Sequence, residues 1–524
     1  MGIMGSGAEI WIVMAGLCLM ITLLVANLMR PGLVLFSIVV LFMCAGVITP
    51  EEALSGFGNK GMLTVALLFL VSEGVRRSNA LGHLIEKLLP ERNDMTVRKG
   101  YARILPTITS VSAFLNNTPV VVVFIPIIKH WAQKVGLPLR KFLIPLSYAA
   151  ILGGMCTLIG TSTNLVVHGM MLEAGFEGFT MFELGKVGLA VAVTGTLYLI
   201  FFAAKRLPGD GNPDQDDTLA HEEEQQADGT TVKAVLGPRF PGINRSLKEF
   251  DFKRHYNARI REIYRDGTVV RNLKDYMFRE GDALLLDTDG SFVRTWGDSS
   301  IFLILSNGKR YELTAPRWKK WLSLFLLTIM IGGATFGTLP AVRSLLHGFE
   351  LDMFFWAAVV TVLMACFGIF PAKKYTKFIS WDVLVTIACA LAISRAMSNS
   401  GLANYIAGKL IDLSGSVSPV AIMAVLYITT NIITELITNN AAAAFAFPIA
   451  LSAAAQLGVD PMPYFVAICI ASSASFSSPI GYQTNMIVQG IGNYRFRDFV
   501  RTGLPLNIIT FVLSMILIPV CWNF

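Results

Sequence analysis

Two kinds of polar phrase occur twice in this chain, each time inside strongly apolar sequence. An Asn-Asn pair stands at 116–117 and again at 439–440, and a Gly-x-x-Thr-Asn phrase follows each pair, at 160–164 and 481–485. The second copies are offset from the first by 323 and 321 residues. Amides and hydroxyls are costly inside a bilayer unless they bind one another, a ligand or water. The duplication therefore predicts a transport site formed between two membrane repeats.

These residue types suit the binding of a cation and an anion together. A glycine allows a membrane helix to unwind, so that freed carbonyls can coordinate a cation while N–H groups of the restarting half-helix receive an anion. Asn and Thr suit both tasks, because they offer oxygens to sodium and N–H or O–H donors to an oxyanion. Interhelical hydrogen bonding is an alternative role for one Asn-Asn pair. Four phrases in the same order favour a site.

The composition is that of an integral membrane protein. Hydrophobic residues make up 54% of the 524 positions and charged residues 15%, and the mean hydropathy is +0.58. The seven cysteines form no CxxC or Cys/His cluster, so neither a disulfide framework nor a metal–thiolate site is indicated. The net charge of +7 resides in membrane-flanking loops, and we expect no nucleic-acid partner. The apolar stretch 10–29 is followed by Arg30-Pro31 rather than a cleavage site, which predicts a retained transmembrane helix.

The apolar spans fall into two sets around a polar interval. Two stretches, 104–128 and 420–451, contain the Asn-Asn pairs, and each can be one polar-interrupted helix or a re-entrant hairpin. The other spans lie near 10–29, 33–48, 62–78, 142–171 and 184–204 in the first set, and near 320–340, 352–370, 381–398, 464–493 and 502–522 in the second.

Loop charge decides between a single helix and a hairpin. The loop after the first Asn-Asn stretch carries Lys129, Lys134, Arg140 and Lys141, whereas its counterpart at 452–463 has no basic residue. The positive-inside rule therefore places equivalent loops on opposite sides of the membrane. Hairpins satisfy this rule with five crossings per half, external termini and a cytoplasmic central insert. We therefore predict an α-helical polytopic fold of two inverted repeats of about five spans, each with a re-entrant hairpin, and a small α/β cytosolic insert.

The predicted domains are membrane repeat 1 (1–206), an acidic linker (207–229), a folded insert (230–315) and membrane repeat 2 (316–524). Within the insert, Arg259–Tyr264 and Ala283–Leu286 have the pattern of strands, and Asp266-Gly267 that of a turn. The insert contains no GxGxxG or GxxxxGK[ST] motif, so nucleotide binding by those devices is not supported.

One acid interrupts the symmetry of the two halves. Glu435 lies four residues before Asn439, where the first half has Ser112 before Asn116. A carboxylate at membrane depth indicates a function, and Glu435 can be a sodium ligand or a proton carrier, or can face the aqueous mouth of the hairpin. Elsewhere, Glu73 and Arg76 are expected to form a local pair, Asp382 to start a span, and His168 to pack or to line a cavity.

The duplicated phrases resemble the divalent anion/sodium symporter family of the ion-transporter superfamily. That family has Ser-Asn-Thr at each hairpin tip, and here Asn116-Asn117-Thr118 and Asn439-Asn440-Ala441 occupy those places. The first position departs from the pattern in both copies, as does Ala441. The resemblance implies one sodium site from Ser112, Asn116, Asn117, Gly160 and Asn164, and another from Glu435, Asn439, Asn440, Gly481 and Asn485. It places the anion by Asn116, Asn117, Thr118, Ser162, Thr163, Asn439, Asn440, Ala441, Gln483 and Thr484.

The insert separately resembles a TrkA C-terminal (RCK-C) domain, through 247–250 and 278–282. Members with such inserts resemble the sulfate-transporter branch of the family. The resemblance implies a homodimer in the plasma membrane, an elevator mechanism and a small-molecule effector at the insert.

We therefore expect a sodium-coupled importer of a divalent oxyanion, sulfate first, with no organic cofactor. A C4-dicarboxylate transporter and a proton-coupled anion transporter are the nearest alternatives. A ligand-gated channel or a membrane sensor operated by the insert is the alternative from another class.

Overall fold

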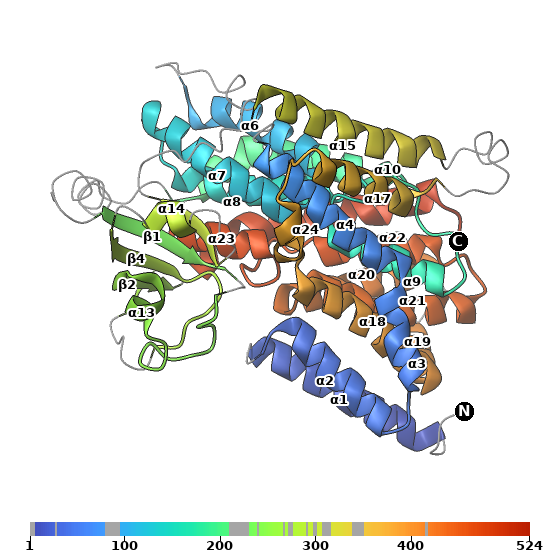
Figure 1. Cartoon of the computed structure of the whole chain (residues 1–524). Coiled ribbons are helices and arrows are strands. Elements are labelled where there is room, and N and C mark those ends of the chain that lie inside the picture. The colour runs from blue at the N-terminus through green and yellow to red at the C-terminus, as the bar shows by residue number, and fades with distance from the viewer. Residues whose placement is uncertain are drawn as a thin grey trace.

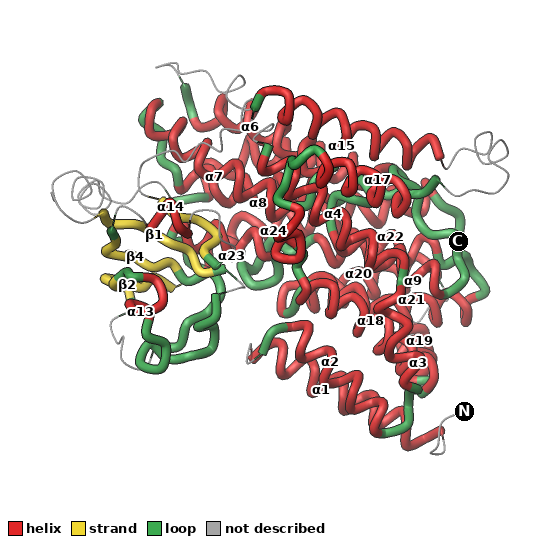
Figure 2. Tube along the Cα trace, in the orientation of Figure 1, coloured by secondary structure: helices red, strands yellow, loops and turns green. Residues whose placement is uncertain are grey.

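The fold is described from a computed structural model of the whole chain. It describes residues 6–26, 29–78, 95–208, 230–237, 240–265, 268–270, 276–289, 292–296, 301–306, 316–337, 351–413 and 418–524. A large helical body carries a small sheet on one side (Figure 1), and within the described residues strands occur only in the insert (Figure 2). Eight helices of this part of the chain are long and apolar enough to cross a membrane. Nearly all of the predicted acidic linker lies outside the described residues.

The first repeat follows the predicted order of spans, with a hairpin at the Asn-Asn pair and a break at the Gly-x-x-Thr-Asn phrase. Its elements are α1 (Ser6–Ala26), α2 (Pro31–Cys44), α3 (Pro50–Ser55), η1 (Gly56–Gly58), α4 (Lys60–Arg77), α6 (Val97–Ser112), α7 (Asn117–Lys134), α8 (Arg140–Gly154), α9 (Ser162–Glu173), α10 (Gly185–Tyr198), η2 (Leu199–Ala203) and α11 (Ala204–Arg206).

The second repeat has a similar sequence of elements. They are α15 (Arg317–Gly337), α17 (Met353–Cys366), η3 (Ala372–Phe378), α18 (Trp381–Asn399), α19 (Leu402–Leu413), α20 (Pro419–Leu436), α21 (Asn439–Leu457), α22 (Met462–Ser473), α23 (Gln483–Gly492) and α24 (Phe496–Cys521). Helix α19 lies between α18 and α20, where residues 79–94 of the first repeat lie outside the described residues. By position, α2 corresponds to α17, α4 to α18, the α6–α7 hairpin to α20–α21, and the broken pair α8–α9 to α22–α23.

Helix packing between the halves is reciprocal. α2 packs on α18 of the second repeat, while their counterparts α17 and α4 pack on each other. α10 and α24 also lie side by side. This exchange of equivalent partners is expected for two repeats related by a pseudo-two-fold axis. The predicted fold class of two inverted repeats, each with a hairpin, is confirmed.

Each hairpin turns next to its Asn-Asn pair, where a few non-helical residues separate its two helices. Residues 113–116 separate α6 from α7, and residues 437–438 separate α20 from α21. Pro119 lies in the first turn of α7, where its missing N–H costs no intrahelical hydrogen bond. The turn therefore places the amides of both tips at helix N-termini.

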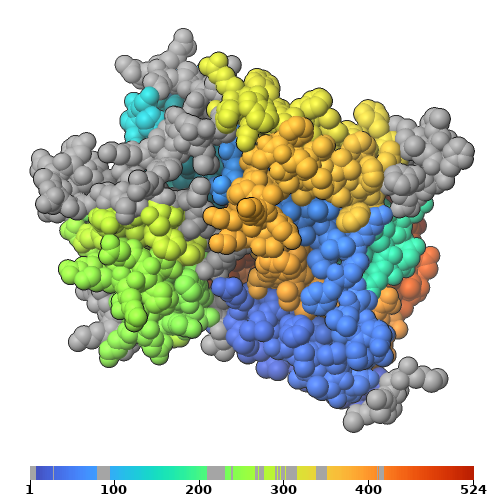
Figure 3. Space-filling model, viewed as in Figure 1, coloured from blue at the N-terminus to red at the C-terminus, as the bar shows by residue number. Residues whose placement is uncertain are grey.

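The insert is an antiparallel sheet with a core of aromatic side chains. Strands β1 (Thr230–Leu236), β2 (Arg259–Arg265), β3 (Thr268–Val269), β4 (Ala283–Thr288) and β5 (Phe302–Ser306) lie in the order β3-β2-β4-β1-β5. Helices α13 (Phe252–Tyr256) and α14 (Phe292–Trp296) accompany them, and the space-filling view shows the insert as a lobe against the helical body (Figure 3). The two predicted strands are confirmed, and the predicted turn at 266–267 lies outside the described residues.

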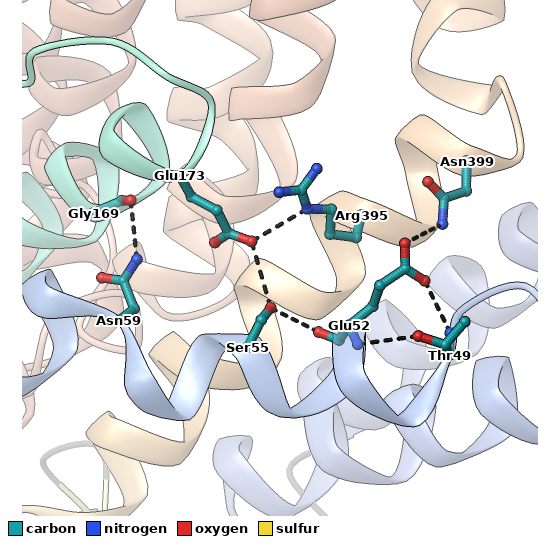
Figure 4. Close-up of polar contacts among 8 residues, drawn as sticks. All are labelled: Thr49, Glu52, Ser55, Asn59, Gly169, Glu173, Arg395 and Asn399. Atoms are coloured by element: carbon teal, nitrogen blue, oxygen red, sulfur yellow. Dashed lines mark hydrogen bonds and ion pairs between the residues drawn. The ribbon is translucent and has the colours of Figure 1, made fainter.

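A polar cluster ties the end of α9 to α18 and to the segment before α4 (Figure 4). Arg395 Nε and Ser55 Oγ both donate to Glu173 Oε1, at 3.2 and 3.4 Å. Asn59 Nδ2 donates to the Gly169 carbonyl oxygen at 3.1 Å. Since α9 begins at the Gly-x-x-Thr-Asn phrase, these contacts hold the far end of a half-helix that starts in the predicted site.

Asn59 has two structural roles that substitutions can separate. Its Oδ1 also accepts from Gly61 N at 2.8 Å, which caps α4. Asn59→Ala removes the cap and the contact to Gly169, and we expect a loss of roughly 1–2 kcal/mol of stability, measured as a lower melting temperature of the purified protein. Asn59→Asp keeps the capping acceptor and should lose less. An unchanged melting temperature for Asn59→Ala would contradict this assignment.

Candidate functional site

Each hairpin tip lies against the broken helix of the opposite repeat. Thr118, in the first tip, donates from Oγ1 to Gln483 Oε1 at 3.1 Å, at the start of α23. Asn440, in the second tip, accepts through Oδ1 from Ser162 Oγ and Thr163 Oγ1, both at 3.2 Å, at the start of α9. Polar residues from both repeats, which are more than 270 positions apart, therefore meet in one region.

Two equivalent asparagines hold the two unwound segments. Asn164 donates from Nδ2 to the carbonyl oxygens of Gly154 and Thr157, which lie 10 and 7 residues earlier in the chain. Asn485 donates in the same way to carbonyls that also lie 10 and 7 residues earlier, those of Ser475 and Ser478. Because the amide hydrogens are used for the backbone, the side-chain oxygens face other donors or a cation; the oxygen of Asn485 accepts from Ser147 Oγ at 2.7 Å.

The centre of the site is the hydroxyl of Tyr482. It lies 3.0 Å from Thr161 Oγ1, and these two residues are 321 positions apart. That separation is also the offset between the two Gly-x-x-Thr-Asn phrases, so equivalent positions of the two repeats touch. The Asn117 amide is 2.5 Å from the same hydroxyl, and the Asn439 side chain also reaches it. The pseudo-two-fold axis thus passes through the Thr161–Tyr482 contact.

Most of the first predicted sodium set is brought together. Ser112 Oγ lies 2.8 Å from the Asn117 amide, which is also within 3.3 Å of the Gly160 carbonyl oxygen. Asn164 reaches the same segment through Gly154, and Asn116 is the N-cap residue of α7. The Ser112 hydroxyl and the Gly160 carbonyl oxygen are ligands of the kind that hard cations prefer. The Asn117 amide nitrogen faces these two oxygens, and the amide oxygen faces the Tyr482 hydroxyl.

Only part of the second predicted sodium set lies around Glu435. Its Oε1 accepts from Ser477 N and Asn507 Nδ2, both at 2.8 Å, and its Oε2 accepts from Ser475 Oγ at 3.2 Å. Ser475 also lies against Gly481, where a Cβ would come within 2.0 Å of its hydroxyl. Glu435 and Gly481 therefore share one neighbour.

Three predicted residues face elsewhere. The hydrogen bonds of Asn440 link it to α9 rather than to Glu435. Ala441 is buried in a small apolar cluster with Ile437, and Thr484 Oγ1 accepts from Ser147 Oγ at 2.8 Å, on α8.

Four helix N-termini meet at the site without side-chain caps. The N-cap residues of α7, α9, α21 and α23 make no capping hydrogen bond in the described structure. Elsewhere in the chain, Thr49, Asn59 and Asp352 cap their helices, whereas α2, α8, α10, α18, α20 and α22 also lack a side-chain cap. The four helices of the site are therefore distinguished by the meeting of their N-termini in one region. The first-turn N–H groups of a helix have no intrahelical partner, and the helix dipole makes this end positive. Four such ends provide N–H donors for an anion.

Several residues of the site were not among the predictions. Tyr482 lies within the second phrase at the position equivalent to Thr161, and Ser475 at the position equivalent to Gly154, so the repeat alignment could have indicated both. Asn507 lies on α24, and nothing in its surrounding sequence marks it as a partner of Glu435.

Predictions for three other polar residues hold. Arg76 pairs with Glu73 at 2.8 Å, and Asp382 lies in the first turn of α18. His168 accepts through Nδ1 from Phe179 N at 3.0 Å and lines a cavity of about 470 Å³, as expected for a packed or cavity-lining histidine.

Comparisons with known proteins agree with this architecture. The model of the Citrate transporter family matches residues 17–353 and 345–523. An uncharacterized transporter of Synechocystis sp., sll0640, is 28% identical over 573 aligned residues, which cover 93% of each chain. Sodium/sulfate cotransporter 2 of Chlamydomonas reinhardtii is 22% identical, over 96% of this chain and 89% of its own.

Two further matches extend the comparison. The sodium-dependent dicarboxylate transporter SdcS of Staphylococcus saprophyticus is 21% identical, over 90% of this chain and 78% of its own. Among solved structures, the YdaH transporter of Alcanivorax borkumensis has a TM-score of 0.52 over 90% of this chain and 87% of its own. At 14% identity, that likeness concerns the fold alone.

The Tyr482 hydroxyl offers a direct test of the central contact. Tyr482→Phe leaves Asn117 and Thr161 without their shared partner, and a lost hydrogen bond of this kind costs roughly 1–1.5 kcal/mol. We expect about a tenfold loss of anion affinity, measured by titration of the purified protein. Tyr464→Phe, which removes a hydroxyl bonded to Pro419 O on another helix, is the matched control. Equal affinities in both variants would remove Tyr482 from the site.

Proposed function

The chain belongs to the Citrate transporter family, and on that premise we propose that it is a sodium-coupled secondary active symporter that imports a divalent oxyanion, with sulfate as first candidate. The observation that supports this proposal is the meeting of four uncapped helix N-termini from two inverted repeats. An anion there is bound by N–H groups, hydroxyls and amides. The partners found for the described tip side chains are hydroxyls and an amide, which carry no charge, so the anion needs positive charge from co-bound cations.

Coupling follows from this need for charge. In our proposal, one sodium binds by Asn117 and Ser112 and another by Glu435 and Asn485. Each cation lowers the electrostatic cost of placing an oxyanion at membrane depth, and the oxyanion does the same for the cations. Two monovalent cations offset the charge of a divalent anion, and the carboxylate of Glu435 leaves one negative charge at the site. Each solute therefore raises the affinity for the others.

Two relatives support an anion substrate. Sodium/sulfate cotransporter 2 supports sulfate, and SdcS supports a C4-dicarboxylate as the alternative within the same fold. A proton-coupled carrier that uses Glu435 is a further alternative.

We also propose an elevator movement of the hairpins and broken helices, a homodimer in the plasma membrane, and a cytoplasmic, RCK-C-like regulatory insert at 230–315. Accumulation of the anion against its gradient in proteoliposomes separates a carrier from a channel or sensor.

The two tip asparagines give the first test of the proposal. We expect Asn117→Ala and Asn440→Ala each to reduce sodium-driven uptake of radiolabelled sulfate into proteoliposomes at least tenfold, because each removes a side chain at which a repeat contacts its opposite. Asn404→Ala is the matched control, since Asn404 pairs with Ser452 away from the tips. Succinate uptake measured in parallel distinguishes the dicarboxylate alternative. Normal sodium-dependent uptake in both tip variants would reject the site assignment.

Glu435 gives the second test, because its donors distinguish a cation ligand from a proton carrier. Ser477 N can only donate to it, and the Asn507 amide nitrogen donates to it as well; donors of this kind favour the ionised carboxylate. Glu435→Gln should therefore raise the sodium concentration for half-maximal uptake severalfold and leave the dependence of uptake on pH between 6 and 8 unchanged. If the substitution instead abolishes the pH dependence, proton coupling through Glu435 replaces sodium at this position.

A further inference from the structure

The insert contacts α23 along the whole length of that half-helix. At the C-terminal end, Lys233 Nζ of β1 donates to the Ile491 carbonyl oxygen at 3.0 Å, where a cation also complements the helix dipole. At the N-terminal end, Gln483 Nε2 donates to Glu280 Oε1 at 3.0 Å. Figure 1 shows α23 beside β1 and β4.

Two glycines permit this close approach. A Cβ at Gly490 of α23 would lie 2.5 Å from the Gly281 carbonyl oxygen. Gly281 itself has φ +85°, a conformation that favours glycine. It follows Glu280 directly, so the tight turn at Gly281 carries the Glu280 side chain to the start of α23.

The Glu280 contact reaches the proposed anion site itself. Gln483 uses its amide nitrogen for Glu280 and its amide oxygen for Thr118 of the first hairpin tip. A single side chain therefore joins the insert, α23 and the opposite repeat. Glu280 is partly buried there, and its carboxylate lies beside one of the four uncapped helix N-termini.

We propose that Glu280 is a tethered competitor of the transported anion: its carboxyl group takes the place of one oxyanion arm at Gln483, and the site binds either the insert or the substrate. This inference rests on the proposed anion site, and it adds the residue through which the insert acts. A carboxyl oxygen, whether the group is protonated or ionised, accepts from the same N–H donors as an oxyanion oxygen. Because the insert is part of the chain, its effective concentration at the site is high, so a weak contact suffices to compete.

The surroundings of Glu280 make the competition depend on pH. Withdrawal from water raises the pKa of Glu280 from 4.5 to about 7, and the charge of Asp382 adds to the rise, while Gln483 and the charge of Arg30 oppose it. An undocked Glu280 has the ordinary pKa, so docking takes up a proton. Docking is therefore strongest below pH 4.5, weakens as the pH rises to about 7 and is constant above that. Between pH 8 and pH 6 the docking equilibrium should strengthen about tenfold.

Uptake kinetics test the competition. Glu280→Ala should lower the half-saturating anion concentration severalfold with little change in the maximal rate, because it removes the competitor and leaves the transport residues intact. Glu280→Gln should reduce the dependence of this concentration on pH between 6 and 8. Glu249→Gln is the control, since Glu249 is an exposed acid of the same insert. An unchanged half-saturating concentration in Glu280→Ala would overturn the inference.

A second variant and a binding readout separate this inference from the proposed function. Gly490→Val should push the insert from α23 and lower the half-saturating concentration in the same direction. Hydrogen exchange of residues 276–286 in the purified full chain reports docking without transport: it should rise when sodium with sulfate or succinate is added. Exchange unaffected by an anion that the protein does transport would overturn the inference alone. Release by succinate without any sulfate uptake would overturn sulfate as the substrate and leave the inference intact.

Discussion

Backbone groups released where a helix unwinds at membrane depth must find partners, and the whole site depends on how that requirement is met. A single unsatisfied group in hydrocarbon costs several kcal/mol. Here Asn164 and Asn485 each supply two amide hydrogens to carbonyls of the unwound segment. The segments can therefore stay open without water, and the N-termini of α9 and α23 stay exposed to the site. The asparagine of each Gly-x-x-Thr-Asn phrase is therefore needed to stabilise the unwound segment, whether or not it also binds a ligand.

The frame is symmetrical, whereas the chemistry on it is not. The carbonyls bound by Asn164 and Asn485 are at equivalent positions, and Thr161 meets its own counterpart Tyr482. Around Glu435 the equivalence ends, because the positions of Ser475 and Ser477 are occupied in the first repeat by Gly154 and Cys156. The second repeat therefore surrounds a carboxylate with donors, while the first offers only neutral oxygens. The two cation sites of our proposal therefore differ in charge, and we expect them to bind sodium with unequal strength.

The sequence predicted the fold and the site best where equivalent positions of the two repeats could be compared. Matched spacing and loop charge predicted the hairpins, the helix breaks and the inversion, since each rests on local polarity and on a rule for the sign of flanking charges. It also drew attention to Glu435, as a departure from an otherwise matched pair. Asn507 and the docking of the insert could not be predicted in this way, because they depend on how distant helices pack. Tyr482 is an intermediate case. The Gly-x-x-Thr-Asn phrase indicated its position, but a tyrosine there is expected to be a packing residue until the structure shows the partners of its hydroxyl.

A second departure from symmetry, at the first residue of each half-helix, explains why the insert contacts the second repeat. The first residue of α9 is Ser162, whose short hydroxyl is directed to Asn440. The first residue of α23 is Gln483, whose longer amide has a donor and an acceptor at separate atoms, so it can bind Thr118 and Glu280 together. A serine at that position has a single hydroxyl and no second side-chain atom that could bind the insert. A longer amide in place of a short side chain thus keeps the proposed anion site and adds a position at which the insert can contact it.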